Sequence, residues 1–184
     1  MRGAGHSTRG PGMIQPIIIT GFMGSGKTTL AQALARTLNC HAIDLDQLIT
    51  EHEGRTPKEI IEQDSESAFR EVETRLLRHV LEEGLGRVIA LGGGAWILGR
   101  NRDLIAQHDA FTVWLDAPFE LCWRRITVAG SDRPLAQSEE QARSLYEERR
   151  RLYQLAALHL TAGEGQSIDE SSLAIAKALH TTES

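Results

Sequence analysis

The residues of this chain with the clearest chemical meaning stand near its N-terminal end, between Gly21 and Thr28. Their sequence, GFMGSGKT, fits the pattern G-x-x-x-x-G-K-[ST]. In such a segment small residues let successive backbone N–H groups curl around a phosphate at the start of a helix. Lys27 is placed to reach the β- and γ-phosphates, and the Thr28 hydroxyl to hold Mg²⁺. The pattern therefore predicts a nucleoside triphosphate site.

The sequence on either side of this segment favours the same interpretation over a chance glycine-rich turn. A β-branched apolar run at 17–20 precedes it, and a stretch rich in alanine and leucine, 27–38, follows. A buried strand, a loop and a helix are the context that phosphate binding requires.

Two acidic residues, Asp44 and Asp46, stand where the second predicted strand ends. Loops that follow the strands of an open parallel sheet meet at one edge, so these acids should lie near the phosphate loop. On an extended chain, side chains two residues apart point to the same side. One carboxylate would then hold Mg²⁺ through water, and the other would accept a proton or hydrogen bond from an acceptor hydroxyl. The alternative for Asp46 is an ordinary helix N-cap.

Two further stretches could bind an acceptor. Arg70 and Glu73 are three residues apart and therefore neighbours on one face of a predicted helix. They form either a surface ion pair or an arginine that an acid orients to grip a carboxylate. The triple glycine 92–94 follows the third predicted strand. It indicates a backbone that another group approaches closely, or alternatively a tight turn.

Positive charge gathers between residues 124 and 151 of a chain whose net charge is -5. Arg133 stands within 128–137, a polar stretch without apolar periodicity that predicts a mobile loop. An arginine on such a lid would stabilise the charge that develops during phosphoryl transfer and would help to exclude water. Arg150 and Arg151 fit a solvated helix better.

Strand-like and helix-like segments alternate from residue 14 onward, which predicts a parallel sheet covered by helices on both faces. The expected architecture is a three-layer α/β/α P-loop fold of the α/β class, with a five-stranded parallel sheet and a mobile lid. Asp64 is the expected N-cap of a long helix that ends near Glu83. The expected strands cover 17–20, a short segment ending within 44–46, 87–91, 111–115 and 157–161.

Length and composition favour one globular domain in a chain of 184 residues. Residues 1–13 are expected to form a disordered tail, and 14–184 a single P-loop domain. The negative net charge argues against a nucleic-acid or membrane-surface binder, and no apolar run has the length of a membrane span. Two cysteines, Cys40 and Cys122, fit core thiols in a reducing compartment, so a cytoplasmic location is expected.

Together these motifs resemble those of the shikimate kinases, a branch of the nucleoside monophosphate kinase-like P-loop proteins. The resemblance extends from Ile14 to about His180 and rests on several motifs in order. They are the phosphate loop, D-x-D at 44–46, F-R-x-x-E at 69–73, the glycine turn at 92–95, R-P-L at 133–135 and R-x-x-L-Y at 149–153.

The resemblance implies transfer of the ATP γ-phosphate to the 3-hydroxyl of shikimate, with Mg²⁺ as cofactor and ADP as product. It implies a monomeric enzyme of chorismate and aromatic amino acid biosynthesis. Catalysis would fall to Lys27, Asp46 and Arg133. Arg125 would stack on adenine, with Arg124 as the alternative. The resemblance implies ATP contacts at Gly24, Ser25, Gly26, Lys27, Thr28, Thr29, Arg125 and Arg133, shikimate contacts at Asp46, Arg70, Gly93, Gly94 and Arg149, and Mg²⁺ contacts at Thr28 and Asp44.

Two alternatives remain open from the sequence. One is a kinase of another small hydroxy acid such as gluconate, and the other is a nucleotide-binding relative without catalysis. The joint presence of F-R-x-x-E, the triple glycine and R-P-L disfavours the first, and the retained lysine, aspartates and arginine disfavour the second. Trp96 and Trp114 fit either the core or the acceptor pocket.

Overall fold

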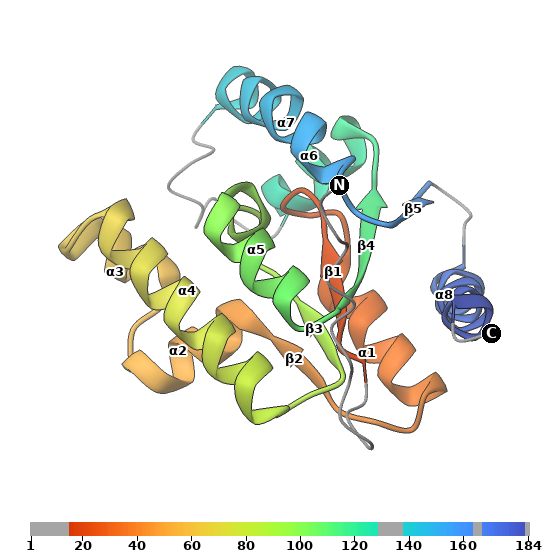
Figure 1. Ribbon diagram of the computed structural model, residues 1–184. Helices are drawn as coiled ribbons and strands as arrows, with labels where there is room; N and C mark the ends of the chain where they lie inside the picture. The colour runs from red at the N-terminus through yellow and green to blue at the C-terminus, as the bar shows by residue number, and fades with distance from the viewer. Residues whose placement is uncertain (1–14, 129–137, 164–166, 183–184) are drawn as a thin grey trace, which may run out of the picture.

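The structure, a computed structural model, describes residues 15–128, 138–163 and 167–182 (Figure 1). Five strands form one parallel sheet in the order β2-β3-β1-β4-β5, which confirms the predicted α/β/α fold. The strands are β1 (Ile17–Thr20), β2 (Ala42–Asp44), β3 (Val88–Ala90), β4 (Phe111–Asp116) and β5 (Leu158–Thr161). The helices are α1 (Lys27–Thr37), α2 (Leu45–Glu53), α3 (Pro57–Gln63), α4 (Glu66–Glu83), α5 (Gly99–Gln107), α6 (Phe119–Val128), α7 (Glu139–Tyr153) and α8 (Ile168–Thr182), with a 3-10 helix η1 (Ala95–Ile97).

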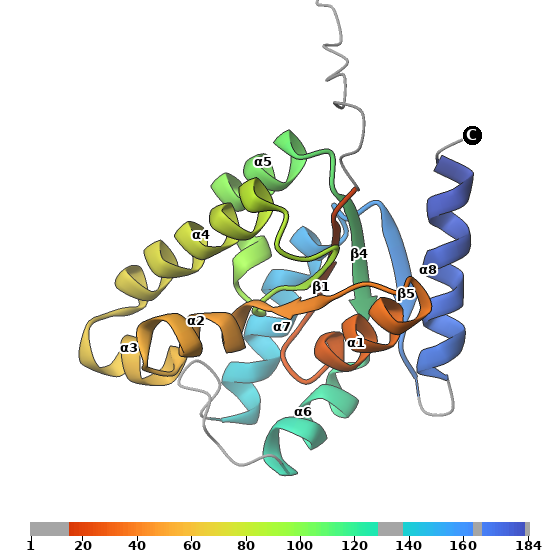
Figure 2. The ribbon, with the colours of Figure 1, turned by 90° about the horizontal axis from the view of Figure 1, so that it is seen from below.

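The sheet separates the hydrophobic core into two layers, and the central strand β1 contributes side chains to both. Successive side chains of a strand point to opposite faces of the sheet. Ile17 and Ile19 accordingly pack with Leu34 of α1 and Ile175 of α8, whereas Ile18 packs with α4, α5 and α7 on the other face. Figures 1 and 2 show α1 and α8 on one side of the sheet and α4 and α5 on the other.

Helix α4 presents an apolar stripe to the sheet that one acidic residue interrupts. Its buried positions follow the 3.6-residue period, and Glu73 lies among them between Phe69 and Leu77. The Ser65 hydroxyl accepts a hydrogen bond from the Ala68 N–H at the start of the helix, and Gly84 ends it in the left-handed conformation. The prediction of Asp64 as the N-cap was therefore wrong. Because α3 still includes Gln63, Asp64 is instead the C-cap of α3.

Helix α7 carries mostly charged residues but buries one narrow stripe. Its buried positions are Ala142, Tyr146, Arg149 and Tyr153, spaced so that they share one face. The stripe therefore carries the Arg149 side chain into the interior of the protein, where only 6% of the residue is exposed. Arg150, next in sequence, lies outside it and forms a partly exposed ion pair with Asp116 at 3.0 Å.

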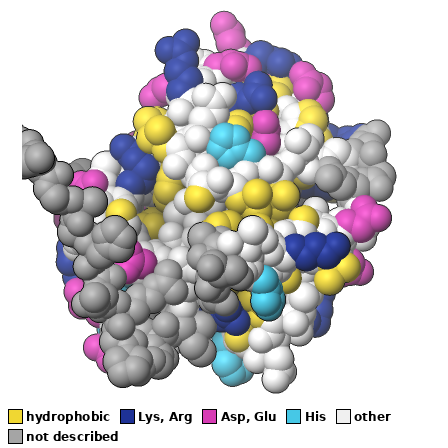
Figure 3. Space-filling view, turned by 45° about the vertical axis from the view of Figure 1, so that its right-hand side comes forward, with side chains coloured by type: hydrophobic (Ala, Val, Ile, Leu, Met, Phe, Trp, Pro, Cys, Tyr) yellow, Lys and Arg dark blue, Asp and Glu magenta, His cyan; other side chains and the backbone are white. Residues whose placement is uncertain are grey.

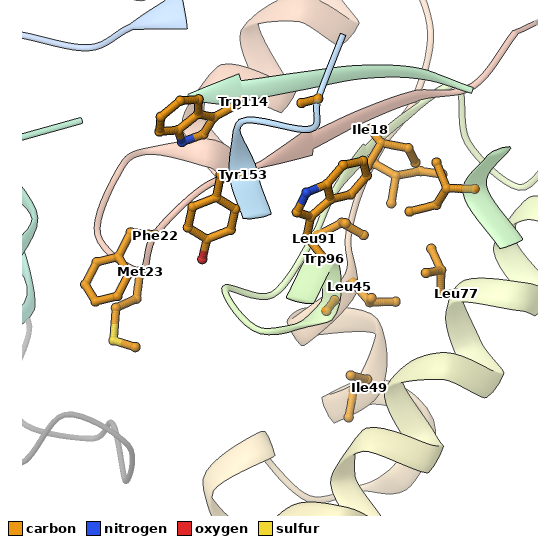
Figure 4. Packing of buried hydrophobic residues seen from close by; sticks show 14 of the residues in the cluster. Ile18, Phe22, Met23, Leu45, Ile49, Leu77, Leu91, Trp96, Trp114 and Tyr153 are labelled. Atoms are coloured by element: carbon orange, nitrogen blue, oxygen red, sulfur yellow. The ribbon is translucent and has the colours of Figure 1, made fainter. Parts of the chain in front are cut away.

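Both tryptophans left open by the sequence belong to the core. Trp96 and Trp114 are buried in the cluster that includes Ile18, Leu77 and Tyr153, as Figure 4 shows. Both cysteines are free thiols. Cys122 is buried within the same cluster. Cys40 is only partly buried and packs against the hydrophobic cluster on the other face of the sheet.

On the face of the molecule shown in Figure 3, acidic and basic side chains are interspersed around a central area of hydrophobic and uncharged side chains. In the three described segments, no helix combines the length and the apolar content that crossing a bilayer would require.

Candidate active site

The phosphate loop joins β1 to α1 with its glycines in conformations that other residues rarely adopt. Gly24 has φ 76°, and a Cβ there would lie 2.7 Å from the Cys122 carbonyl oxygen. Gly26 is the N-cap of α1 with φ 103°, and no side chain in the described part of the chain caps the helix there. The first N–H groups of α1 therefore point toward a place where an anion would satisfy them.

Two polar side chains of the loop, those of Lys27 and Ser25, are buried in positions that suit phosphate binding. The Lys27 ammonium is almost wholly buried and donates to the Phe22 carbonyl oxygen at 2.9 Å, which holds it over the loop. The Ser25 hydroxyl is buried and has no hydrogen-bond partner in the described part of the chain. Buried hydroxyls are normally paired, so this one fits a site that a phosphate oxygen completes.

Thr28 and Asp44 meet beside the loop. The Thr28 hydroxyl donates to Asp44 Oδ2 at 2.5 Å, while Asp44 Oδ1 accepts from the N–H groups of Asp46 and Gln47 and so caps α2. A hydroxyl and a carboxylate are the hard oxygen ligands that Mg²⁺ uses when phosphates and water supply the rest. The described residues contain no group of three or more His, Cys, Asp or Glu side chains that could hold a metal ion by itself. The pair therefore fits Mg²⁺ shared with a nucleotide.

The expectation that Asp44 and Asp46 lie on one extended segment was wrong. The strand ends at Asp44, and α2 begins at Leu45, so Asp46 lies in the first turn of a helix. The cap is Asp44, not Asp46, because only the residue before the helix can accept the first free N–H groups. Asp46 is thereby rotated away from Asp44 and toward the glycine turn, where its Oδ1 would lie 2.6 Å from a Cβ built on Gly92.

A pocket of about 260 Å³ extends from the loop toward α8. Arg125 lines it, and its Nη1 donates to the carbonyl oxygens of Gly24 and Ser25 at 3.1 and 3.0 Å. These bonds fix the guanidinium across the start of α1, where a planar base could stack on it. Of the two neighbouring arginines, Arg125 is the one that lines this pocket. Ile168 and Ser171 from α8 line its other side, and the sequence motifs gave no sign of them.

The triple glycine is approached closely by three side chains. A Cβ on Gly92 would lie 2.6 Å from Asp46 Oδ1 and 2.9 Å from Glu73 Oε1, and one on Gly94 would lie 2.6 Å from the Arg70 guanidinium carbon. Any larger residue at Gly92 or Gly94 would therefore force these side chains out of their present positions. The turn therefore gathers two carboxylates and one guanidinium around its backbone.

The same turn joins the acidic and basic groups to the phosphate loop. A Cβ on Gly93 would lie 3.4 Å from the Met23 backbone nitrogen and 3.7 Å from Arg149 Nη1. Arg149 donates to the Gly93 carbonyl oxygen at 3.1 Å, although α7 lies far away in sequence. Arg70, Arg149 and Asp46 thus converge beside the phosphate loop. Arg133 and the predicted lid lie outside the described residues.

Glu73 is the residue of this site whose importance the sequence understated. It is fully buried, its Oε2 accepts from Arg70 Nη1 at 2.8 Å, and its Oε1 has no hydrogen-bond partner in the described part of the chain. Burial raises the pKa of Glu73 to about 7, and the nearby Asp46 carboxylate adds to this, against the lowering effect of Arg70 and Arg149. The sequence did contain one sign of this: Glu73 occupies a position in the apolar stripe of an amphipathic helix, where a carboxyl group would be buried.

Replacing Glu73 by Gln should change how the stability of the protein depends on pH. The folded pKa of about 7 lies above the ordinary value of 4.5, so the contribution of Glu73 is complete below pH 4.5 and is lost as the pH rises through 7. Between these limits the wild type should lose about 1 to 3 kcal/mol of unfolding free energy relative to Glu73→Gln. Urea unfolding at about pH 5 and pH 8 measures this.

Glu82→Gln is the matched control for that comparison. Glu82 is half-exposed on the same helix and pairs with Arg78 at 3.8 Å. Its replacement should alter the unfolding free energy by less than about 0.5 kcal/mol at either pH. A Glu73→Gln protein whose stability difference from the wild type does not change with pH would contradict the prediction.

Comparison with known proteins agrees with this arrangement. A family model described as "Shikimate kinase" matches residues 23–180. A shikimate kinase of Sulfurihydrogenibium sp. is 39% identical over 148 residues, which cover 79% of this chain and 87% of the relative. A shikimate kinase of Cereibacter sphaeroides is 35% identical over 168 residues, which cover 90% of this chain and 82% of the relative.

Solved structures agree as well. The shikimate kinase of Acinetobacter baumannii in complex with shikimate superimposes with a TM-score of 0.83 at 29% identity, covering 92% of this chain and 94% of that one. The family model covers most of the chain, including α1, α4, the glycine turn and α7. This chain therefore belongs to the shikimate kinase family.

Proposed function

We propose that this chain transfers the γ-phosphoryl group of ATP to the 3-hydroxyl of shikimate, giving shikimate 3-phosphate and ADP. The observation that carries the proposal is the convergence of Arg70, Arg149 and Asp46 on a glycine turn that abuts the phosphate loop. Two guanidinium groups beside a carboxylate and backbone N–H groups match a small acid with several hydroxyls. That set lies where the phosphate loop would present a γ-phosphate.

The nucleotide side of the proposal rests on the loop and the pocket beside it. The N–H groups at the start of α1, the Ser25 hydroxyl and Lys27 would hold the β- and γ-phosphates. Thr29 lines the pocket near Arg125, which would stack on the base. Thr28 and Asp44 would hold Mg²⁺, which when bound neutralises phosphate charge and orients the phosphates.

The acceptor side of the proposal assigns each polar group a partner. Arg70, held by Glu73, and Arg149 would bind the carboxylate of shikimate through paired N–H donors. The N–H groups of Gly93 and Gly94 would bind ring hydroxyls, and Asp46 would orient the 3-hydroxyl and accept its proton. Phosphoryl transfer needs mainly positioning and charge stabilisation, and these residues supply the positioning.

Charge stabilisation during transfer would come from Lys27 and Arg133. Lys27 is already directed over the loop by the Phe22 carbonyl oxygen. Arg133 stays the proposed lid arginine that arrives when both substrates are bound. A monomeric state and a cytoplasmic location stay predictions.

Release of ADP with shikimate as the acceptor tests the proposal. The purified chain with ATP and Mg²⁺ should release ADP in proportion to added shikimate, and should release little with gluconate or with EDTA present. The product should carry phosphate on the 3-hydroxyl, which phosphorus NMR identifies. Equal ADP release with gluconate, or release that does not depend on any acceptor, would exclude the proposed function.

A further inference from the structure

The carbonyl oxygen of Gly93 receives two hydrogen bonds from α7. The Tyr153 hydroxyl donates to it at 2.5 Å, and Arg149 Nη1 donates at 3.1 Å. A carbonyl oxygen has two lone pairs, so α7 satisfies both. This carbonyl lies between two glycines whose N–H groups the acceptor would contact under the proposed function.

That carbonyl belongs to the central peptide of a turn. The Ala95 N–H donates to the Gly92 carbonyl oxygen at 3.1 Å, which closes a four-residue turn with Gly93 and Gly94 in the middle. Gly94 has φ -107° and ψ -14°, close to the third residue of a type I turn. A type II turn differs by a flip of the central peptide and needs φ of about +80° at that residue.

The local sequence does not decide between these two turns. Glycine adopts the positive φ of a type II turn without steric cost, and at Gly94 the absence of a Cβ leaves room for the Arg70 guanidinium. Because residues 93 and 94 are both glycine, their own side chains do not prevent the central peptide from flipping. Something outside the turn has to select one orientation.

The orientation matters because a peptide group is planar and trans. The Gly93 carbonyl and the Gly94 N–H belong to the same peptide plane and point in opposite directions. When α7 holds the carbonyl, the Gly94 N–H must point away from α7. A flip would turn the N–H away from the acceptor and present a carbonyl oxygen in its place.

Tyr153 is held firmly enough to make this selection. It is 1% exposed, and its ring stacks on Trp114 of β4 with centroids 6.3 Å apart. Figure 4 shows its hydroxyl on the side away from Trp114. Trp96 Nε1 donates to the Leu152 carbonyl oxygen at 2.8 Å, a second link between this end of α7 and the segment after the turn. Burial raises the pKa of Tyr153 far above its ordinary value, so the hydroxyl stays a donor.

We propose that Tyr153 is a positioning residue for the acid acceptor: its hydroxyl, together with Arg149, holds the Gly93 carbonyl and thereby aims the Gly94 N–H at the acceptor. The acceptor identity rests on the proposed function. Tyr153 does not touch the acceptor, and the nucleotide site does not depend on it. The effect of the hydroxyl is therefore confined to the acceptor side.

Tyr153→Phe tests this inference because it removes one oxygen and keeps the ring on Trp114. Without the hydroxyl, part of the population has the flipped peptide, which lowers apparent affinity in proportion to the competent fraction. The KM for shikimate should rise about tenfold, the worth of one well-placed hydrogen bond, while the KM for ATP and kcat change less than about twofold. The substrate selects the competent turn at saturation, which is why kcat is spared.

Tyr146→Phe is the matched control. Tyr146 is also buried on α7, and its hydroxyl also donates to a backbone carbonyl oxygen, that of Ala117, at 3.0 Å. Both variants should lower the midpoint of thermal unfolding to a similar extent. Only Tyr153→Phe should raise the KM for shikimate. If the two variants give the same KM as the wild type, the hydroxyl is merely structural and the inference is wrong.

A spectroscopic readout separates this inference from the proposed function. In protein labelled with ¹⁵N-glycine, the Gly94 amide resonance should shift or broaden in Tyr153→Phe and stay in place in Tyr146→Phe. This holds whether or not shikimate is the acceptor. An unmoved Gly94 resonance would overturn the inference, whereas a wild-type enzyme inactive toward shikimate would overturn the proposed function.

Discussion

Lys27→Met should lower kcat for shikimate phosphorylation about 10³-fold, the cost of removing one preorganised donor from a developing negative charge. The Lys27 ammonium is held in place before any ligand arrives, because it is almost wholly buried and donates to the Phe22 carbonyl oxygen. Methionine keeps the length and most of the packing of the side chain but has no charge. The loss should therefore fall on the chemical step.

Steady-state rates of ADP release, with shikimate saturating, measure this effect. The midpoint of thermal unfolding of Lys27→Met should stay within a few degrees of the wild type, which shows that the loop still folds. Lys177→Met is a suitable control, since Lys177 lies on α8 and outside the nucleotide pocket. A Lys27→Met enzyme with more than about a tenth of wild-type kcat would refute the assigned role.

Arg70→Ala should lower kcat/KM for shikimate by about 10² to 10³-fold and leave the KM for ATP nearly unchanged. Arg70 is mostly buried, forms an ion pair with Glu73 at 2.8 Å and packs against Gly94. Under the proposed function, its removal takes away one of the two guanidinium groups that bind the acceptor carboxylate. It also leaves Glu73 without its partner, so the carboxyl group should keep its proton at neutral pH.

Arg75→Ala on the same helix is the control for Arg70→Ala. Arg75 is exposed and pairs with Glu53 at 2.5 Å on the outside of α4. Its replacement should change kcat/KM for either substrate by less than about twofold. The double variant Arg70→Ala, Glu73→Gln should recover stability but not shikimate use. Recovery of activity in that double variant would mean that Arg70 acts through the fold alone.

Local sequence patterns predicted the elements of this fold well, because each pattern reports on a few neighbouring residues. The β-branched run before Gly21 and the phosphate loop appear in the structure as predicted. The N-cap of α4 was misplaced by one residue, since Asp64 and Ser65 are both good caps and only the end of α3 decides between them. The strand order, with β1 at the centre, depends on packing between distant segments, which no local pattern contains.

For the candidate site too, the sequence predicted the local motifs but not the contacts between distant residues. Motif spacing identified Arg70 and the triple glycine, but the reason for the glycines became clear only from the side chains that touch them. The helical spacing of Arg70 and Glu73 was visible in the sequence. That Glu73 Oε1 has no hydrogen-bond partner among the described residues was not. The link from Tyr153 to Gly93 spans sixty positions and has no sequence signature.

Asp44 serves two helices with one side chain. Its Oδ2 accepts the Thr28 hydroxyl of α1, and its Oδ1 caps α2, which carries Asp46. If Asp44 and Asp46 act as proposed, replacing Asp44 would disturb the nucleotide side and the acceptor side of the site together. A change of acceptor preference made through Asp44 would then cost nucleotide binding as well. Positions on α4, such as Arg70, do not share this double attachment, so under the proposed function they are where acceptor preference can change alone.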